Sequence, residues 1–217
     1  MIYSENIFVC LAAPLLIAVF LLEGDTRRFI GFFLLGLTAC LLAGYCNGYI
    51  EQFAVGNGLG ETQFVIQFAP VCEEILKALP VFFYMAVFEP KRRGIVSCAL
   101  AVGLGFATQE NVGYIAYYGA GELPFALVRG FSAGIMHAIC AAILGYGLSF
   151  VYRRRWLEIT GSFAVICAAA TFHATYNLLV SAEGAWRGLG YILPVVAAAV
   201  ILLFVRQAGK ATSGRRE

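Results

Sequence analysis

Apolar stretches long enough to cross a lipid bilayer recur along the whole of this 217-residue chain. A helix needs roughly 20 residues to cross a hydrocarbon core of about 30 Å. Seven such stretches are present, at residues 5–22, 29–50, 62–88, 94–118, 124–152, 157–181 and 188–205. Only 13% of the residues are charged, too few for the surface of an ordinary soluble domain. The stretches lack the alternating polarity of membrane β-strands, so we expect an all-α, polytopic membrane helix bundle.

The basic residues lie in every second connection between these stretches. Twelve of the fifteen Lys and Arg residues are there: Arg27, Arg28, Lys91, Arg92, Arg93, Arg153, Arg154, Arg155, Arg206, Lys210, Arg215 and Arg216. Cytoplasmic loops collect Lys and Arg, so the pattern places the N-terminus outside and the C-terminus inside. The other loops, at 51–61, 119–123 and 182–187, carry glutamates such as Glu122 and a single Arg187. Because the basic clusters form no continuous face, we expect no nucleic-acid partner.

Polar and ionisable residues inside the spans need an explanation, because a charge near the bilayer centre costs at least a few kcal/mol. They are Glu73, Glu74 and Lys77 in the third span, Glu110 and Asn111 in the fourth, His137 in the fifth, and His173 and Asn177 in the sixth. At the helical rise of about 1.5 Å per residue, both histidines, Glu73 and Glu110 lie roughly 12 to 20 Å below the outer surface. We therefore expect one shared cavity near mid-membrane that opens toward the outer half.

Helical spacing groups these residues further. Glu73 and Lys77 are four residues apart, as are His173 and Asn177, so each pair shares a helix face. Two adjacent buried carboxylates tend to hold a proton between them, which makes them a candidate general base. Structural explanations stay open, because the glutamate and lysine could only lock helices together and the histidines could be helix contacts. Arg129, near the outer end of its span, is expected to extend to the interface and is assigned no role.

The same residues resemble the PrsW family of bacterial membrane proteases, within the wider group that includes the type II CAAX prenyl endopeptidases. The resemblance covers about residues 62–181, which we expect to be the motif-bearing core of a single domain, 1–217. Its motifs here are Glu73-Glu74-x-x-Lys77, Phe106-x-x-x-Glu110-Asn111, His137 and His173-x-x-x-Asn177. The chain departs from the CAAX branch, where the second motif is Phe-x-x-x-His. The resemblance implies an endopeptidase of the bacterial inner membrane that cuts a membrane-anchored protein, commonly an anti-sigma factor, in regulated intramembrane proteolysis.

Peptide hydrolysis needs an activated water, donors for the developing oxyanion and an acid for the leaving amine. We expect Glu73, helped by Glu74, to take the proton from water. His173 and Asn177 would donate to the oxyanion, and Lys77 would keep one carboxylate ionised.

A metal is the open question of this mechanism, because His137 and Glu110 either orient the water themselves or bind a metal that does so. Glu110, His137 and His173 make a plausible three-ligand zinc site, and zinc lowers the pKa of bound water to about 7. The chain has no HExxH helix, so a metal-free glutamate mechanism also fits. Asn111 belongs to the expected catalytic set through its place in the second motif. The alternatives are a non-catalytic membrane scaffold, which would tolerate loss of Glu73, and a proton-coupled transporter, which would show pH-dependent flux.

Overall fold

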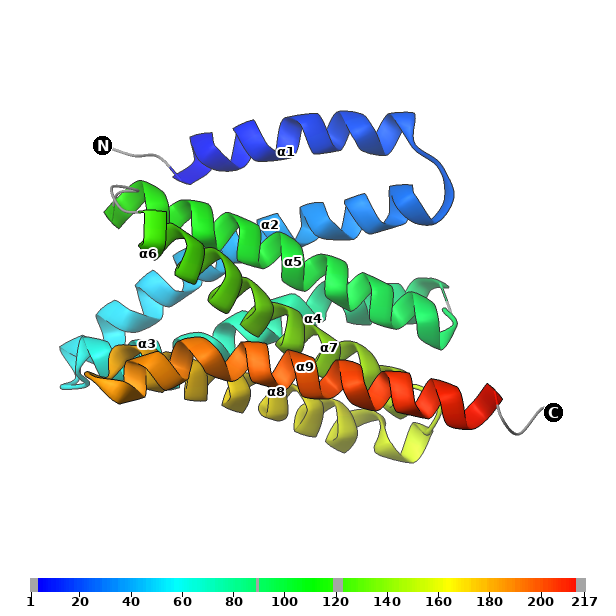
Figure 1. The fold of residues 1–217 in the computed structure, drawn as a ribbon. Helices are drawn as coiled ribbons and strands as arrows, with labels where there is room; N and C mark the ends of the chain where they lie inside the picture. Colours follow the sequence, from blue (N-terminus) through cyan, green and yellow to red (C-terminus); the bar gives the residue numbers. More distant parts are fainter. Residues whose placement is uncertain (1–3, 89, 119–122, 214–217) are drawn as a thin grey trace.

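The computed structural model describes residues 4–88, 90–118 and 123–213, and these residues form helices joined by short connections (Figure 1). The helices are α1 (Ser4–Leu21), α2 (Gly24–Gly56), α3 (Glu61–Gln67), α4 (Ala69–Phe88), α5 (Arg92–Tyr118), α6 (Leu123–Val128), the π-helical turn η1 (Arg129–Ala133), α7 (Gly134–Val151), the 3₁₀ turn η2 (Arg155–Leu157), α8 (Glu158–Ser181) and α9 (Ala185–Ser213). Glu122, Arg215 and Arg216 lie outside the described residues.

The predicted all-α, polytopic membrane bundle is confirmed. Within the described residues, four helical segments are long and apolar enough to cross a membrane: Gly24–Gly56, Arg92–Tyr117, Ala126–Val151 and Glu158–Ser181. Ile7–Leu21 and Ala185–Ile201 are shorter apolar segments. α4 covers most of the third predicted span, and its 20 residues include three charged side chains that are buried inside the bundle.

The third span is two helices, where the sequence predicts one helix over 62–88. α3 ends at Gln67 and α4 begins at Ala69, with Phe68 between them. Pro70 occupies the first turn of α4, where its missing N–H removes no hydrogen bond from the helix. The break therefore lies one turn before the acidic pair of α4.

α4 packs against α2, α5, α7 and α8, which puts it at the centre of the bundle. Next to it, a core cluster contains Met136, Cys140 and Leu144 of α7 with Tyr176 of α8. Large apolar side chains face outward on other helices, for example Phe163 of α8 with 70% of its surface exposed. Such a surface matches a hydrocarbon surrounding, while the charges of α4 are sheltered from it.

α2 and α5 cross at a point where both backbones come into contact. A Cβ atom at Gly36 would collide with the carbonyl oxygen of Val102, and one at Gly105 would collide with the carbonyl oxygen of Phe33. Figure 1 shows the two helices running in the same direction and diverging on either side of this crossing. Glycine is needed at both positions because any side chain would force the helices apart.

Candidate active site

The charges of α4 lie in two layers, one behind the other. Glu74 and Lys77 form the inner layer, with only 0% and 1% of their side chains exposed. Glu73 belongs to an outer layer together with Glu110 of α5, and both line a cavity. The two adjacent glutamates separate in this way because successive residues of a helix point about 100° apart.

The Lys77 ammonium holds the inner layer together. Its Nζ donates to Glu74 Oε1 at 2.7 Å and to His137 Nδ1 at 2.9 Å. The ring of Phe106 lies 4.0 Å from the same atom. A carboxylate, an imidazole and an aromatic face together compensate a charge that has lost its water. The i,i+4 spacing suggested that Lys77 pairs with Glu73. Lys77 forms its ion pair with Glu74 instead, three residues before it in the sequence.

The two histidines connect the inner layer to the outer one. An ammonium can only donate, so His137 Nδ1 accepts from Lys77 and its Nε2–H donates to Glu110 Oε2 at 2.7 Å. An ionised carboxylate can only accept, so His173 Nδ1–H donates to Glu74 Oε1 at 2.9 Å. His173 Nε2 lies 3.7 Å from Glu73 Oε2, and in a neutral imidazole with this tautomer it keeps a lone pair. Of the two histidines, His173 is therefore the one whose second ring nitrogen can accept in the outer layer when the ring is neutral.

A cavity of about 240 Å³ lies in front of the outer layer. The predicted site residues that line it are Glu73, Glu110, His173 and Asn177. Glu73 Oε1 accepts from Asn47 Nδ2 at 3.5 Å. Glu73 Oε2 is buried and has no hydrogen-bond partner among the described residues. The structure thus brings residues from three of the motif-bearing spans to one cavity, and a carboxylate oxygen in it has unused hydrogen-bonding capacity.

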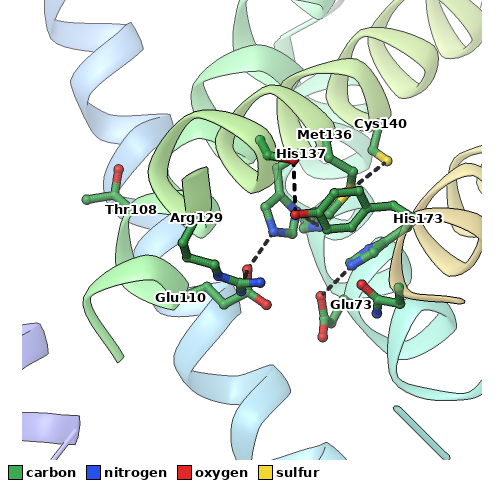
Figure 2. Close-up of polar contacts among 12 residues, drawn as sticks. Glu73, Thr108, Glu110, Arg129, Met136, His137, Cys140 and His173 are labelled. Atoms are coloured by element: carbon green, nitrogen blue, oxygen red, sulfur yellow. Dashed lines mark hydrogen bonds and ion pairs between the residues drawn. The ribbon is translucent and has the colours of Figure 1, made fainter. Parts of the chain in front are cut away.

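Arg129 is a site residue that the sequence analysis missed. Its Nη2 lies 3.0 Å from Glu110 Oε2, its guanidinium carbon lies 3.7 Å from the ring of Tyr114, and only 14% of its side chain is exposed. The expected extension to the interface is therefore wrong. Figure 2 shows Arg129 and His137 turned toward the same carboxylate.

The π-helical turn η1 explains how Arg129 reaches this position. Eight residues of regular α-helix advance about 80° beyond two full turns, which would point Arg129 and His137 in different directions. A π-helical turn inserts one extra residue, so the two positions behave as if they were seven apart and share a face. An arginine inside an apolar span was the available signal, because such a charge faces a protein interior more often than lipid.

The two asparagines of the motifs have different surroundings. Asn177 lines the cavity, and its Nδ2 donates to the backbone oxygen of Val65 in α3 at 3.2 Å. Asn111 is not among the residues that line the cavity, and its buried Oδ1 has no hydrogen-bond partner among the described residues. The structure therefore brings Asn177, and not Asn111, to the cavity.

Glu74, His137 and His173 form a buried group that could hold a metal ion. Each offers one ligand atom, and within the described part of the chain these atoms lie within 4.8 Å of one another. The carboxylate that accompanies both histidines here is Glu74, where the sequence suggested Glu110. The Lys77 ammonium already bonds to two of the three residues, so a cation at this point would have to displace it.

The outer layer offers a second set of metal donors. His173 Nε2 has a lone pair when the ring is neutral, and Glu73 Oε2 has no hydrogen-bond partner among the described residues. Behind the histidine, the Glu74 carboxylate accepts the Nδ1–H, which is the usual support of a metal-binding histidine. These two atoms are an oxygen and a nitrogen, the kinds of donor that zinc accepts, and the hydrogen bonds of the Lys77 ammonium go to Glu74 and His137 instead.

Comparisons with known proteins place the chain among membrane proteases. The family profile for PrsW family intramembrane metalloproteases matches residues 25–205, which include every motif helix. Protease PrsW of Bacillus subtilis (strain 168) is 29% identical over 173 residues, which cover 75% of this chain and 72% of that protein. No solved structure matches the chain significantly. Because the profile covers most of the chain and all the residues that build the cavity, the chain belongs to the PrsW family of intramembrane metalloproteases.

Proposed function

We propose that this protein is an endopeptidase that cleaves a membrane-anchored protein at the outer-layer cavity, with Glu73 as the general base. One observation carries the assignment. Glu73 Oε2 is a buried carboxylate oxygen without a hydrogen-bond partner among the described residues, and it lies 3.7 Å from His173 Nε2, which is an acceptor in the neutral imidazole that we propose. A water between these two acceptors would donate one proton to each, which is how a base prepares water for attack.

The other side chains of the cavity divide the remaining work. Glu73, once protonated, returns the proton to the leaving amine. Asn177 supplies a donor to the oxyanion, because only one of its two amide N–H groups is used on Val65. In this scheme His173 orients the water. The sequence-based hypothesis gave it a donor role, but its N–H is directed to Glu74.

Glu74, Lys77 and His137 act from behind the cavity as positioning residues. Glu74 fixes the tautomer of His173, and Lys77 fixes that of His137, which in turn holds Glu110. A charged lysine also keeps Glu74 ionised, so Glu74 remains an acceptor throughout the reaction.

Zinc is the metal that we propose for the outer layer. His173 Nε2 and Glu73 Oε2 are the donors that would hold it, since catalytic zinc sites use nitrogen and oxygen ligands and leave one position open. With zinc bound, Glu73 would serve as a ligand, and the role of general base given to it above belongs to the metal-free site. When bound, zinc would supply a water already poised for deprotonation at neutral pH. The positioning roles of Glu74 and His137 are the same with or without the metal.

The domain organisation, membrane orientation and substrate that we propose are based on the family and on the charge pattern. We propose a single domain, 1–217, with its motif-bearing core at about 62–181, embedded in a bacterial inner membrane with the N-terminus outside and the C-terminus inside. The substrate is then a membrane-anchored protein such as an anti-sigma factor. The expected partners of the enzyme are the lipid bilayer and this membrane-anchored substrate.

The experiment is cleavage of a tagged single-span protein by purified enzyme, with and without a zinc chelator. Glu73→Gln should lower the rate about 100-fold or more, because the amide cannot take a proton. Glu61→Gln, which changes an exposed glutamate of α3, is the matched control and should cleave like wild type.

Loss of activity on chelation, restored by zinc, would support the metal. Full activity of Glu73→Gln would sink the assignment, and no cleavage by wild type would favour a scaffold or a transporter.

A further inference from the structure

The cavity in front of Glu73 continues into a groove between α2 and α5. The groove has a volume of about 570 Å³. The residues that line both spaces are Cys40, Gly44, Glu51, Glu110 and Tyr114. Gly113 and Tyr117 extend the groove along α5, and 69% of the Tyr117 surface is exposed. A shared lining therefore leads from the surface of the bundle to the proposed base.

The groove is open because α2 and α5 diverge after their glycine crossing. Gly44 and Gly113 each lie eight residues beyond the crossing positions Gly36 and Gly105, about 12 Å along the helices. A Cβ atom at Gly44 or Gly113 would meet nothing within 4 Å, whereas one at either crossing glycine would hit backbone. Glycine thus brings the helices together at one level and leaves space between them at another.

The lining of the groove is polar in a way that suits a peptide. Gln109 is only 4% exposed, and its Oε1 is a buried acceptor with no hydrogen-bond partner among the described residues. A buried acceptor without a donor is unfavourable, and a lipid tail has no donor to offer. A peptide backbone offers one N–H for almost every residue.

We propose that this groove admits an extended segment of a single-span substrate to Glu73, and that Gln109 Oε1 accepts one of its backbone N–H groups. The inference rests on the protease function proposed above. In a transmembrane α-helix the backbone groups are hydrogen-bonded within the segment, which leaves them unavailable to another protein. A segment that binds in the groove in extended form has lost these hydrogen bonds, and its released backbone groups then need partners inside the protein.

Filling the groove tests the route through catalysis. Gly113→Leu and Gly44→Leu should each lower cleavage of a tagged protein with one apolar span about ten-fold or more. Gly188→Leu is the matched control, since Gly188 lies in α9, is exposed and also has open space at its Cβ. Gln109→Leu should raise KM about five- to ten-fold and leave kcat nearly unchanged, as expected for a lost hydrogen bond to bound substrate. Groove-filled enzymes that cleave like wild type would overturn the route.

Crosslinking tests the same route without relying on activity. A photo-crosslinking amino acid at Leu41 or Tyr117, in the Glu73→Gln background, should capture the same tagged single-span protein. The control position is Phe163, which is exposed on α8 and outside the groove. Capture should fall when Gly113→Leu is added.

The two experiments separate failure of the route from failure of the protease function. Capture in the groove without cleavage by the unmutated enzyme would keep the groove as a peptide site and reject the protease function. Cleavage with capture only at Phe163 would reject the groove and keep the protease. Neither cleavage nor capture would reject both.

Discussion

The Lys77 ammonium is the side chain on which the inner layer depends most. Lys77→Met would leave the buried Glu74 carboxylate without its counter-charge, and removing one partner of a buried pair costs about 3 to 5 kcal/mol. We expect a loss of this size in the free energy of unfolding, measured by SDS titration in mixed micelles. Adding Glu74→Gln to Lys77→Met should restore part of the loss, because no uncompensated charge then remains.

The exposed pair of Arg28 and Asp25 is the control for this prediction. Its atoms lie 3.1 Å apart, with 47% and 96% of the two side chains exposed. Arg28→Met should change the free energy of unfolding by no more than about 1 kcal/mol, as is usual for solvated pairs. An equal loss in Lys77→Met and Arg28→Met would contradict the account of the inner layer.

Arg129 is expected to position Glu110. Arg129→Ala removes the ion pair with the Glu110 carboxylate. Among the ion pairs of the described residues, Glu110 then keeps only its contact with His137, so its carboxylate can shift. A displacement of about 1 Å in a catalytic site can lower a rate about 100-fold. We expect kcat to fall about 10- to 100-fold in the cleavage assay with little change in KM, and Arg129→Lys to recover part of it. Arg187→Ala, which removes an exposed arginine bonded to the Ala182 backbone, should behave like wild type.

At the scale of elements, the α2–α5 crossing is where a small substitution should have the largest effect. Gly36→Ala places a methyl group against the Val102 carbonyl, and overpacking of this kind costs about 1 to 3 kcal/mol. Gly31→Ala lies on the same helix with open space at its Cβ, so it should be neutral or stabilising by about 0.5 to 1 kcal/mol. Thermal unfolding in detergent compares the two. Equal midpoints would show that the helices do not cross as closely as described.

The π-helical turn η1 is an element that the helical periodicity of the sequence does not predict. A pattern of 3.6 residues per turn predicts the span at 124–152 as one regular helix. The structure resolves this stretch into α6, η1 and α7, and the extra residue in η1 rotates Arg129 onto the face that carries His137. Such turns occur frequently at functional sites, and local propensity does not reveal them.

For the whole molecule, the orientation in the membrane is the property to test. The distribution of Lys and Arg predicts that the loop containing Glu183 is outside and the loop containing Lys91 is inside. Alkaline phosphatase, which is active only outside, should be active when fused after Glu183 and inactive when fused after Lys91. The opposite pattern of activities would show that the bundle has the inverse orientation, with the opening of the groove on the cytoplasmic side.

The membrane helix bundle and the common level of the polar groups could be predicted from the sequence because both depend on positions along the helix axis. A span is recognised by its apolar length, and depth is a residue count multiplied by the helical rise. These quantities do not depend on neighbouring helices. They were enough to predict that Glu73, Glu110 and His173 meet at one level, and the four ordered motifs then indicated the family that the profile match shows.

Which groups touch was decided only by the tertiary structure, because contacts depend on how each helix is rotated about its axis. That rotation is set by packing, such as the backbone contact at Gly36, and by the extra residue of η1. It pairs Lys77 with Glu74, directs Nε2 of His173 toward Glu73, and brings Arg129 to the cavity. The groove between α2 and α5 has the same origin, since two helices that touch at one level must diverge along their length when they cross at an angle.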